Sequence, residues 1–159
     1  MIVSVINLSD VGGCGLGTYT CLGVQHCRIN DAIITSVNFP FGYEPVSICN
    51  WQIMTDPGTY ISLTFHEFDV PGMPTGCVGN SDRVQIHDGG PGSRLLAVFC
   101  NKDPPVAEVY ASFNQMSIIF TTDGKIEGKG FKAEYHATRF TSTSRNKSTS
   151  SDRKFVHDF

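Results

Sequence analysis

The chain has 159 residues, of which 40% are hydrophobic and 17% are charged, and its formal net charge is −3. This size suits one ordinary domain with tails, and the hydrophobic fraction suffices for a packed core. The sparse charge and the acidic balance argue against a nucleic-acid partner, which normally requires a basic face. No apolar run approaches the roughly 18 residues that a membrane-spanning helix needs, so no membrane span is predicted.

The composition changes twice along the chain and divides it into three zones. Residues 1–26 are rich in glycine, lack a periodic pattern and contain Cys14 and Cys21. Residues 27–138 carry dense strand signals and form the predicted domain. Residues 139–159 are rich in serine and threonine with little to bury, so we expect a disordered linker or tail. The apolar start lacks the basic residues and the length of a signal sequence, so we expect a fragment or an isolated domain of a larger protein.

Four runs in the central zone alternate between apolar and polar residues with a period of two. In residues 59–68, Ile61, Leu63 and Phe65 share one face, whereas His66 lies on the other. Such alternation is typical of antiparallel sheets that bury one face. The other three runs cover residues 82–87, 115–122 and 130–135.

Turn signals separate these runs, and no segment shows a convincing helical period. We count about eight short strands with turns between them, a pattern that indicates a sandwich or a barrel. The predicted fold class is therefore all-β, with two antiparallel sheets packed face to face and disulfide bridges near their edges. The turn-forming residues, mainly Gly, Pro and Asp, gather at 56–58, 71–74, 88–92, 104–105 and 123–124.

The six cysteines are an even number, which suits complete pairing into disulfides. Cys27 and Cys49 bracket one segment, and Cys77 and Cys100 bracket another of nearly equal length. The absence of a CxxC motif and of a following histidine pair argues against a thiolate zinc site. Disulfides form in oxidising compartments, so we expect a secreted protein or the extracellular part of a membrane protein. A cytosolic protein with reduced cysteines is the alternative, and the spacing by itself does not choose among the possible pairings.

The large aromatic residues of the predicted strands are interpreted as core. Trp51 lies two positions after Cys49 on a strand, and therefore on the same face as that cysteine. We expect two tyrosines to lie in the core or at its edge, with the hydroxyl reaching a partner. The residues assigned in this way are Trp51, Phe65, Phe68, Phe120, Phe131, Tyr43 and Tyr135.

We predict no catalytic site in this chain. The five histidines fall on different segments or on outward strand positions, and no Gly-x-Ser-x-Gly, HExxH or phosphate-binding loop occurs. Two Asn-x-Ser sequons, at Asn7 and Asn146, lie in the tails. They are candidate glycosylation sites and are compatible with secretion.

Several short motifs follow one another in order through the central zone. In this combination they resemble the CUB domain family, an extracellular module of complement proteases, tolloid-type proteases and spermadhesins. The resemblance covers roughly residues 27–137. The motifs that carry it are Asn38-Phe39-Pro40 with Gly42-Tyr43, Cys49-Asn50-Trp51-Gln52-Ile53, Phe68-Asp69-Val70, Asp82-Arg83-Val84-Gln85-Ile86-His87-Asp88-Gly89, Phe99-Cys100, Ile118-Ile119-Phe120-Thr121-Thr122-Asp123, and Lys129-Gly130-Phe131 with Ala133 and Tyr135.

The resemblance implies a jelly-roll-like sandwich and two specific disulfides. It implies that Cys27 pairs with Cys49 and that Cys77 pairs with Cys100. With these four cysteines assigned, Cys14 and Cys21 are left to pair with each other in the N-terminal extension.

Many CUB domains hold a calcium ion in the loops at one end, through one Glu and two Asp positions. Asp82 and Asp123 match the two Asp positions, whereas the Glu position falls on Pro71, which has no side-chain oxygen. Ligand charge sets calcium affinity, so this loss predicts weak calcium binding or none. The alternative role of the two aspartates is to bond backbone amides in the loops. Other acids that lie near these positions are Glu67, Asp69 and Glu127, and Lys125 lies near the same hairpin.

The predicted function is that of a non-catalytic extracellular binding module, part of a larger multidomain protein. Its partner would be an extracellular protein or glycoprotein, and we expect the loops around Asp82 and Asp123 to form the recognition end. The first alternative is a single-domain carbohydrate or glycoprotein binder of the spermadhesin type. The second is an accessory domain of a secreted protease, whose chemistry would reside in another part of the chain.

Overall fold

The computed structural model describes residues 24–73, 76–79, 81–100, 102–124 and 128–141. Within these ranges the chain is built from strands, and no helix in them is long and apolar enough to cross a membrane. The strands are β1 (Val24–Cys27), β2 (Asp31–Thr35), β3 (Ile48–Met54), β4 (Thr59–Asp69), β5 (Arg83–His87), β6 (Leu95–Phe99), β7 (Val109–Tyr110), β8 (Gln115–Thr121) and β9 (Gly130–Arg139).

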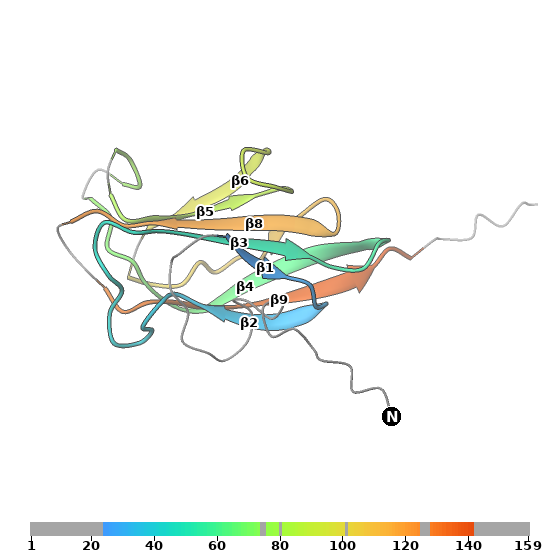
Figure 1. Ribbon diagram of the computed structural model, residues 1–159, viewed down its shortest axis with the longest axis horizontal. Coiled ribbons are helices and arrows are strands. Elements are labelled where there is room, and N and C mark those ends of the chain that lie inside the picture. Colours follow the sequence, from blue (N-terminus) through green and yellow to red (C-terminus); the bar gives the residue numbers. More distant parts are fainter. Residues whose placement is uncertain (1–23, 74–75, 80, 101, 125–127, 142–159) are drawn as a thin grey trace, which may run out of the picture.

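These strands form two sheets that pack face to face (Figure 1). The five-stranded sheet has the order β1-β3-β8-β5-β6, and the four-stranded sheet has the order β2-β9-β4-β7. Neighbouring strands are antiparallel in every pair except β1 with β3, which is parallel. The predicted all-β sandwich is therefore confirmed, with one parallel pair that the alternation did not predict.

Strand β4 shows how the sequence pattern becomes buried surface. Its residues alternate between buried and more exposed from Thr59 to Phe65, as the period-two pattern predicts. The pairing with β9 then shifts between Phe65 and Glu67, which is a bulge. Because of this extra residue, Phe65 and Phe68 both face the core although they are an odd number of positions apart.

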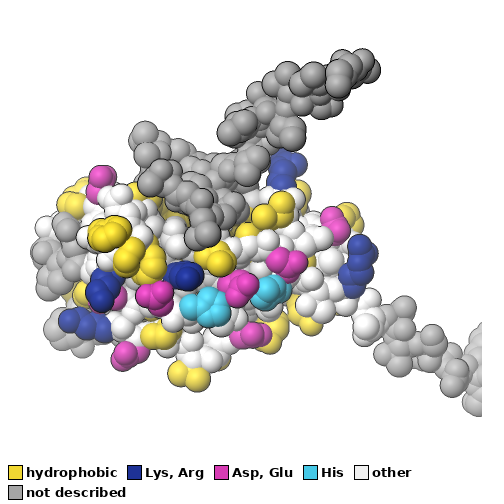
Figure 2. All heavy atoms as spheres, turned by 90° about the horizontal axis from the view of Figure 1, so that it is seen from below, with side chains coloured by type: hydrophobic (Ala, Val, Ile, Leu, Met, Phe, Trp, Pro, Cys, Tyr) yellow, Lys and Arg dark blue, Asp and Glu magenta, His cyan; other side chains and the backbone are white. Residues whose placement is uncertain are grey.

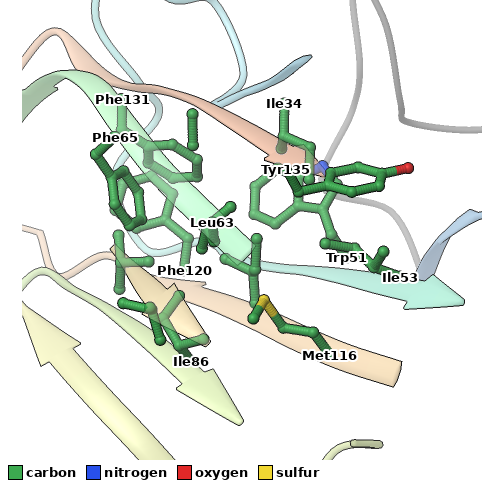
Figure 3. Close-up of a cluster of buried hydrophobic side chains, with 14 of the residues drawn as sticks. Ile34, Trp51, Ile53, Leu63, Phe65, Ile86, Met116, Phe120, Phe131 and Tyr135 are labelled. Carbon is green, nitrogen blue, oxygen red and sulfur yellow. The ribbon is translucent and has the colours of Figure 1, made fainter. Parts of the chain in front are cut away.

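Aromatic rings from both sheets fill the space between them (Figure 3). Phe131 of β9 is fully buried and contacts the rings of Trp51, Phe65 and Phe120 edge to face, at centroid distances of 5.5–5.6 Å. Edge-to-face pairs are favourable because the positive edge of one ring meets the negative face of the next. The residues predicted as core are all buried, namely Trp51, Phe65, Phe68, Phe120, Phe131, Tyr43 and Tyr135.

One predicted disulfide is present as expected. Cys77 and Cys100 are bonded, with their Cα atoms 5.5 Å apart. The bond joins the segment before β5 to the residue that follows β6, so it fastens the loops at the edge of the five-stranded sheet.

The other predicted bond, between Cys27 and Cys49, does not fit the strand register. Cys27 lies beside Ile53 on the neighbouring parallel strand, whereas Cys49 lies four residues earlier on that strand. At about 3.3 Å per residue this offset is about 13 Å, and a disulfide requires Cα atoms about 4.4–6.8 Å apart. Both cysteines are buried and disulfide-bonded. The predicted Cys14–Cys21 bond lies outside the described residues.

Disulfide mapping of the native protein tests this correction. After non-reducing digestion, we expect Cys77 and Cys100 in one linked peptide pair, and Cys27 and Cys49 in two different pairs. Because the chain has six cysteines, we expect Cys14 in one of these pairs and Cys21 in the other. A linked peptide that joins Cys27 directly to Cys49 would show that the register of β1 on β3 is wrong.

The central ring of the core offers a test of the packing. Replacing Phe131 with Ala removes four edge-to-face or stacked ring contacts and leaves a cavity, so we expect a loss of about 3–5 kcal/mol in the free energy of unfolding. Urea unfolding of the disulfide-intact protein measures this. Phe41→Ala is the matched control, because Phe41 is 93% exposed and its loss should cost less than about 0.5 kcal/mol.

Candidate functional site

Asp82 and Asp123 come together at one end of the sandwich because their strands are neighbours. Asp82 directly precedes β5, Asp123 follows β8, and these strands pair so that Arg83 lies opposite Thr121. The backbone N–H of Asp123 donates to Oδ1 of Asp82 at 2.5 Å. The resemblance therefore identified two residues that do meet, although the contact runs from a backbone amide to a side chain.

Tyr43 completes this cluster from the connection between β2 and β3. Its ring packs edge to face on Phe120 with centroids 4.9 Å apart, and its hydroxyl donates to Oδ2 of Asp82 at 2.5 Å. Asp82 is 2% exposed, and each of its carboxylate oxygens accepts a hydrogen bond from the protein. The predicted partner of the Tyr43 hydroxyl is thus a buried carboxylate that the sequence pattern did not identify.

Burial dominates the acid–base properties of both side chains. It raises the pKa of Asp82 above its ordinary value; hydrogen bonds from Tyr43 and from the Asp123 amide oppose this, and the nearby Asp123 charge adds to it. Burial also raises the pKa of Tyr43, and the hydrogen bond to Asp82 and the charge of that residue raise it further. Tyr43 consequently stays neutral and remains a hydrogen-bond donor at physiological pH.

The same hydrogen-bond network fixes the loop that leads into β3. The N–H of Val46 donates to the carbonyl oxygen of Asp123 at 2.9 Å. Thr122 Oγ1 accepts from the N–H of Ser47 at 2.8 Å and donates to the carbonyl of Glu44 at 3.0 Å. The loop is thereby tied to the end of β8 at three points.

The described residues do not fit a calcium ion at this position. Both oxygens of Asp82 are engaged, Pro71 offers no side-chain oxygen, and Oδ2 of Asp69 accepts the N–H of Lys129 at 3.0 Å. No group of three or more His, Cys, Asp or Glu side chains within the described ranges could hold a metal. Lys125 and Glu127, and the sequons at Asn7 and Asn146, lie outside the described residues.

The burial of Asp82 keeps its carboxylate out of contact with any partner. A side chain that is 2% exposed cannot reach another protein. Three apolar residues of the β2–β3 connection and the start of β3 can, because Phe41 is 93%, Val46 81% and Ile48 65% exposed. Sequence reasoning missed this surface, since exposed apolar residues in loops carry no periodic signal.

Two histidines on outward strand positions share an acidic neighbour, Glu134, on the outer face of the four-stranded sheet. His66 Nε2 lies 2.9 Å from Glu134 Oε2, His136 Nε2 lies 3.5 Å from Glu134 Oε1, and His136 Nδ1 lies 3.0 Å from Asp31 Oδ1. Figure 2 shows histidine side chains among acidic ones on this side of the molecule. Only the register of β4 on β9, which places Thr64 opposite Glu134, reveals the pairing.

A second exposed group consists of aromatic rings at the opposite end of the sandwich. Tyr60 lies 6.3 Å from Tyr110 and 5.5 Å from Phe140, and Phe140 lies 6.5 Å from Phe113, measured between ring centroids. Tyr110, Phe113 and Phe140 are each more than half exposed. We call these four residues the aromatic cluster.

Comparison with known proteins identifies the family. The family model for the CUB domain matches residues 21–135. The chain belongs to the CUB domain family. The match begins at Cys21, whereas the predicted domain begins at Cys27, and it ends close to the predicted boundary at residue 138.

Human cubilin is 39% identical over 107 residues, which cover 65% of this chain and 3% of cubilin. The Drosophila melanogaster dorsal-ventral patterning protein tolloid is 36% identical over 104 residues, which cover 65% of this chain and 9% of tolloid. The chain therefore spans a small part of the length of these relatives. The CUB1-EGF-CUB2 structure of human MASP-1/3 superposes with a TM-score of 0.65 and 26% identity, covering 76% of this chain and 43% of that one.

These comparisons establish the general role of the domain. CUB domains are typically extracellular protein-interaction modules in multidomain proteins, and they are non-catalytic. Proteases such as tolloid owe their activity to other domains. A CUB2 domain of MASP-1 bound to Ca²⁺ has the same fold, with a TM-score of 0.59 and 23% identity over 70% of this chain and 96% of that one.

The buried carboxyl of Asp82 makes a test by pH possible. In Asp82→Asn, the amide oxygen can accept from the Asp123 N–H and the amide nitrogen can donate to the Tyr43 oxygen, so the fold should be kept. The raised pKa means that the folded state binds the proton more tightly than the unfolded state. The carboxyl therefore contributes fully to the free energy of unfolding below the ordinary Asp pKa. This contribution is lost as the pH rises through the higher pKa of the folded state. We expect the unfolding free energy of the wild type, relative to Asp82→Asn, to fall as the pH rises from about 4.

Asp88→Asn provides a control of opposite sign. Burial alone would raise the pKa of Asp88, but hydrogen bonds from Ser112 and Arg94 outweigh it and lower the pKa. Its contribution is present above the ordinary Asp pKa and is lost as the pH falls through the lowered folded-state value. For each position, the difference in unfolding free energy between the wild type and the Asn variant is followed against pH. If this difference changed in the same direction with pH for Asp82 and Asp88, the assignment of Asp82 as a buried acid with a raised pKa would be wrong.

Proposed function

We propose that this CUB domain is an extracellular recognition module for protein partners within a larger secreted or membrane-attached protein. The observation that carries the proposal is the set of exposed apolar side chains, Phe41, Val46 and Ile48, on the β2–β3 connection and the start of β3. We call these three residues the apolar loop surface. The three residues lie within one short stretch of the chain, 41–48, and exposed apolar groups gathered in one part of a domain mark interaction sites more often than scattered ones do.

The loop that carries Val46 is held by backbone hydrogen bonds in the free domain. Hydrogen bonds from Val46 and Ser47 to Asp123 and Thr122 hold its backbone. Loops that are ordered before binding lose less conformational entropy when a partner docks. The network around Asp82 therefore supports recognition without contacting the partner.

The backbone of Val46 also supports a functional role. Its φ of 52° lies in the left-handed region, which costs a β-branched residue roughly 1–2 kcal/mol. With 81% of its surface exposed, the side chain contributes little to the core that would offset this cost. A residue that is both strained and exposed is better explained by what it contacts outside the domain.

The chemistry of this surface indicates the kind of partner. Apolar groups bind apolar groups through the hydrophobic effect, so we infer a protein with a complementary apolar patch. A partner's Lys or Arg is not the expected anchor, because Asp82 is buried beneath the surface.

Carbohydrate or glycoprotein binding is the second candidate, and the aromatic cluster favours it. Exposed aromatic rings offer apolar faces to the C–H faces of sugars, and Glu108 lies beside them, accepting from Tyr110 and Thr64. A role as an accessory domain of a secreted protease is compatible with either surface, because it concerns the rest of the protein.

Parallel arrays distinguish the two candidates. The purified domain is tested against extracellular ectodomains and against glycans, together with Val46→Asp and Phe113→Ser. We expect ectodomain binding that Val46→Asp weakens more than about tenfold, as for a residue at the centre of an interface.

Val106→Asp is the matched control, since Val106 is an exposed valine like Val46 but lies in the connection between β6 and β7. It should leave ectodomain binding unchanged. Glycan binding that is lost in Phe113→Ser and kept in Val46→Asp would favour the carbohydrate candidate instead.

A further inference from the structure

We propose that the hydrogen-bond network of Tyr43, Asp82 and Asp123 replaces a calcium ion in this domain, so that its loop end is ordered without any cation. This inference deepens the proposed function, because it makes recognition by the apolar loop surface independent of calcium. The network lies at the end of the sandwich where the side chains of Asp82, Pro71 and Asp69 do not fit a calcium ion.

The first step concerns the carboxylate that would have to bind the ion. Oδ2 of Asp82 faces the Tyr43 hydroxyl, and Oδ1 faces the N–H of Asp123. Each oxygen therefore already has one of its lone pairs taken by a protein donor. A calcium ion would have to reach the remaining lone pairs of a side chain that is only 2% exposed.

The second step concerns the number of charged ligands. Calcium is usually bound by about six to eight oxygen atoms. The affinity of the site depends on how many of these oxygens carry charge. Pro71 contributes none, and Asp69 is drawn to the N–H of Lys129. The segment around Pro71 is also packed against the chain, since a Cβ on Gly128 would clash with Cδ of Pro71 and with the Asp69 carbonyl oxygen.

The third step is that the hydrogen bonds already connect the two aspartate positions that an ion would join, and tie a third segment to them through Tyr43. Tyr43 belongs to the β2–β3 connection, Asp82 to the segment before β5, and Asp123 to the residues after β8. From Asp123 the connection continues to Val46, whose N–H donates to its carbonyl oxygen. A continuous path of protein groups thus runs from the aromatic core at Phe120 to the exposed apolar loop surface.

Thermal unfolding of the full chain with its disulfides intact tests the absence of a cation requirement. The melting temperature is compared in EDTA, in calcium chloride at about 10 mM, which exceeds the dissociation constants of extracellular calcium modules, and in the same concentration of magnesium chloride. We expect all three values to agree within about 1 °C, whereas an occupied site would raise the calcium value by several degrees.

Tyr43→Phe tests whether the network does the ordering. It keeps the ring that packs on Phe120 and removes the hydroxyl. We expect a lower melting temperature, by the same amount with and without calcium, and faster deuterium uptake at the amides of residues 46–47 and 122–123. Tyr60→Phe is the matched control. It should change neither the melting temperature nor the deuterium uptake of residues 46–47 and 122–123.

Three results would overturn the proposal: a rise in melting temperature specific to calcium, a Tyr43→Phe variant that behaves like the wild type, or calcium that restores the order lost in that variant. None of these measurements uses a partner. The network can therefore fail while recognition by the apolar loop surface stands, and the array experiment can fail while the network stands.

Discussion

The packing of Phe131 and Phe120 between the two sheets is the contact on which the rest of the domain depends. Phe131 comes from the four-stranded sheet and Phe120 from the five-stranded sheet, and their rings meet 5.5 Å apart, edge to face. Phe120 also supports the ring of Tyr43, so the core extends without a break to the hydroxyl that meets Asp82. The position of the loop end is therefore a consequence of core packing, because Tyr43, which bonds Asp82, is held in place by the close-packed rings of the core.

Much of the fold could be predicted from alternation alone, and the strand β4 shows why. Its apolar residues repeat every second position, and the pattern identifies both the strand and its buried face. Alternation carries no information about which strand lies alongside, however. The parallel pairing of β1 with β3 was therefore missed, and with it the offset that separates Cys27 from Cys49. The two-residue strand β7 was also too short to produce a period.

The candidate site was predictable in part, for a similar reason. Motif order placed Asp82 and Asp123 at corresponding loop positions, and the structure brings them together. Burial could not be read from the motif, because an Asp in a turn is usually exposed, whereas this one lies beneath Tyr43. The partner of the Tyr43 hydroxyl is 39 positions away in sequence, a separation that no local pattern reports. The pairing of His66 with Glu134 was hidden in the same way by distance along the chain.

The replacement of an acid by Pro71 and the burial of Asp82 make sense together. Like charges that share a site disfavour ionisation, and Asp123 already raises the pKa of Asp82. A third carboxylate at position 71 would add to this repulsion in any domain that has no cation to neutralise it. Proline removes that charge, and two hydrogen bonds offset part of the desolvation cost of the carboxylate that remains. If the network replaces the ion as proposed, the loop end presents Val46 and Phe41 on a backbone held by protein hydrogen bonds, and its order does not depend on calcium.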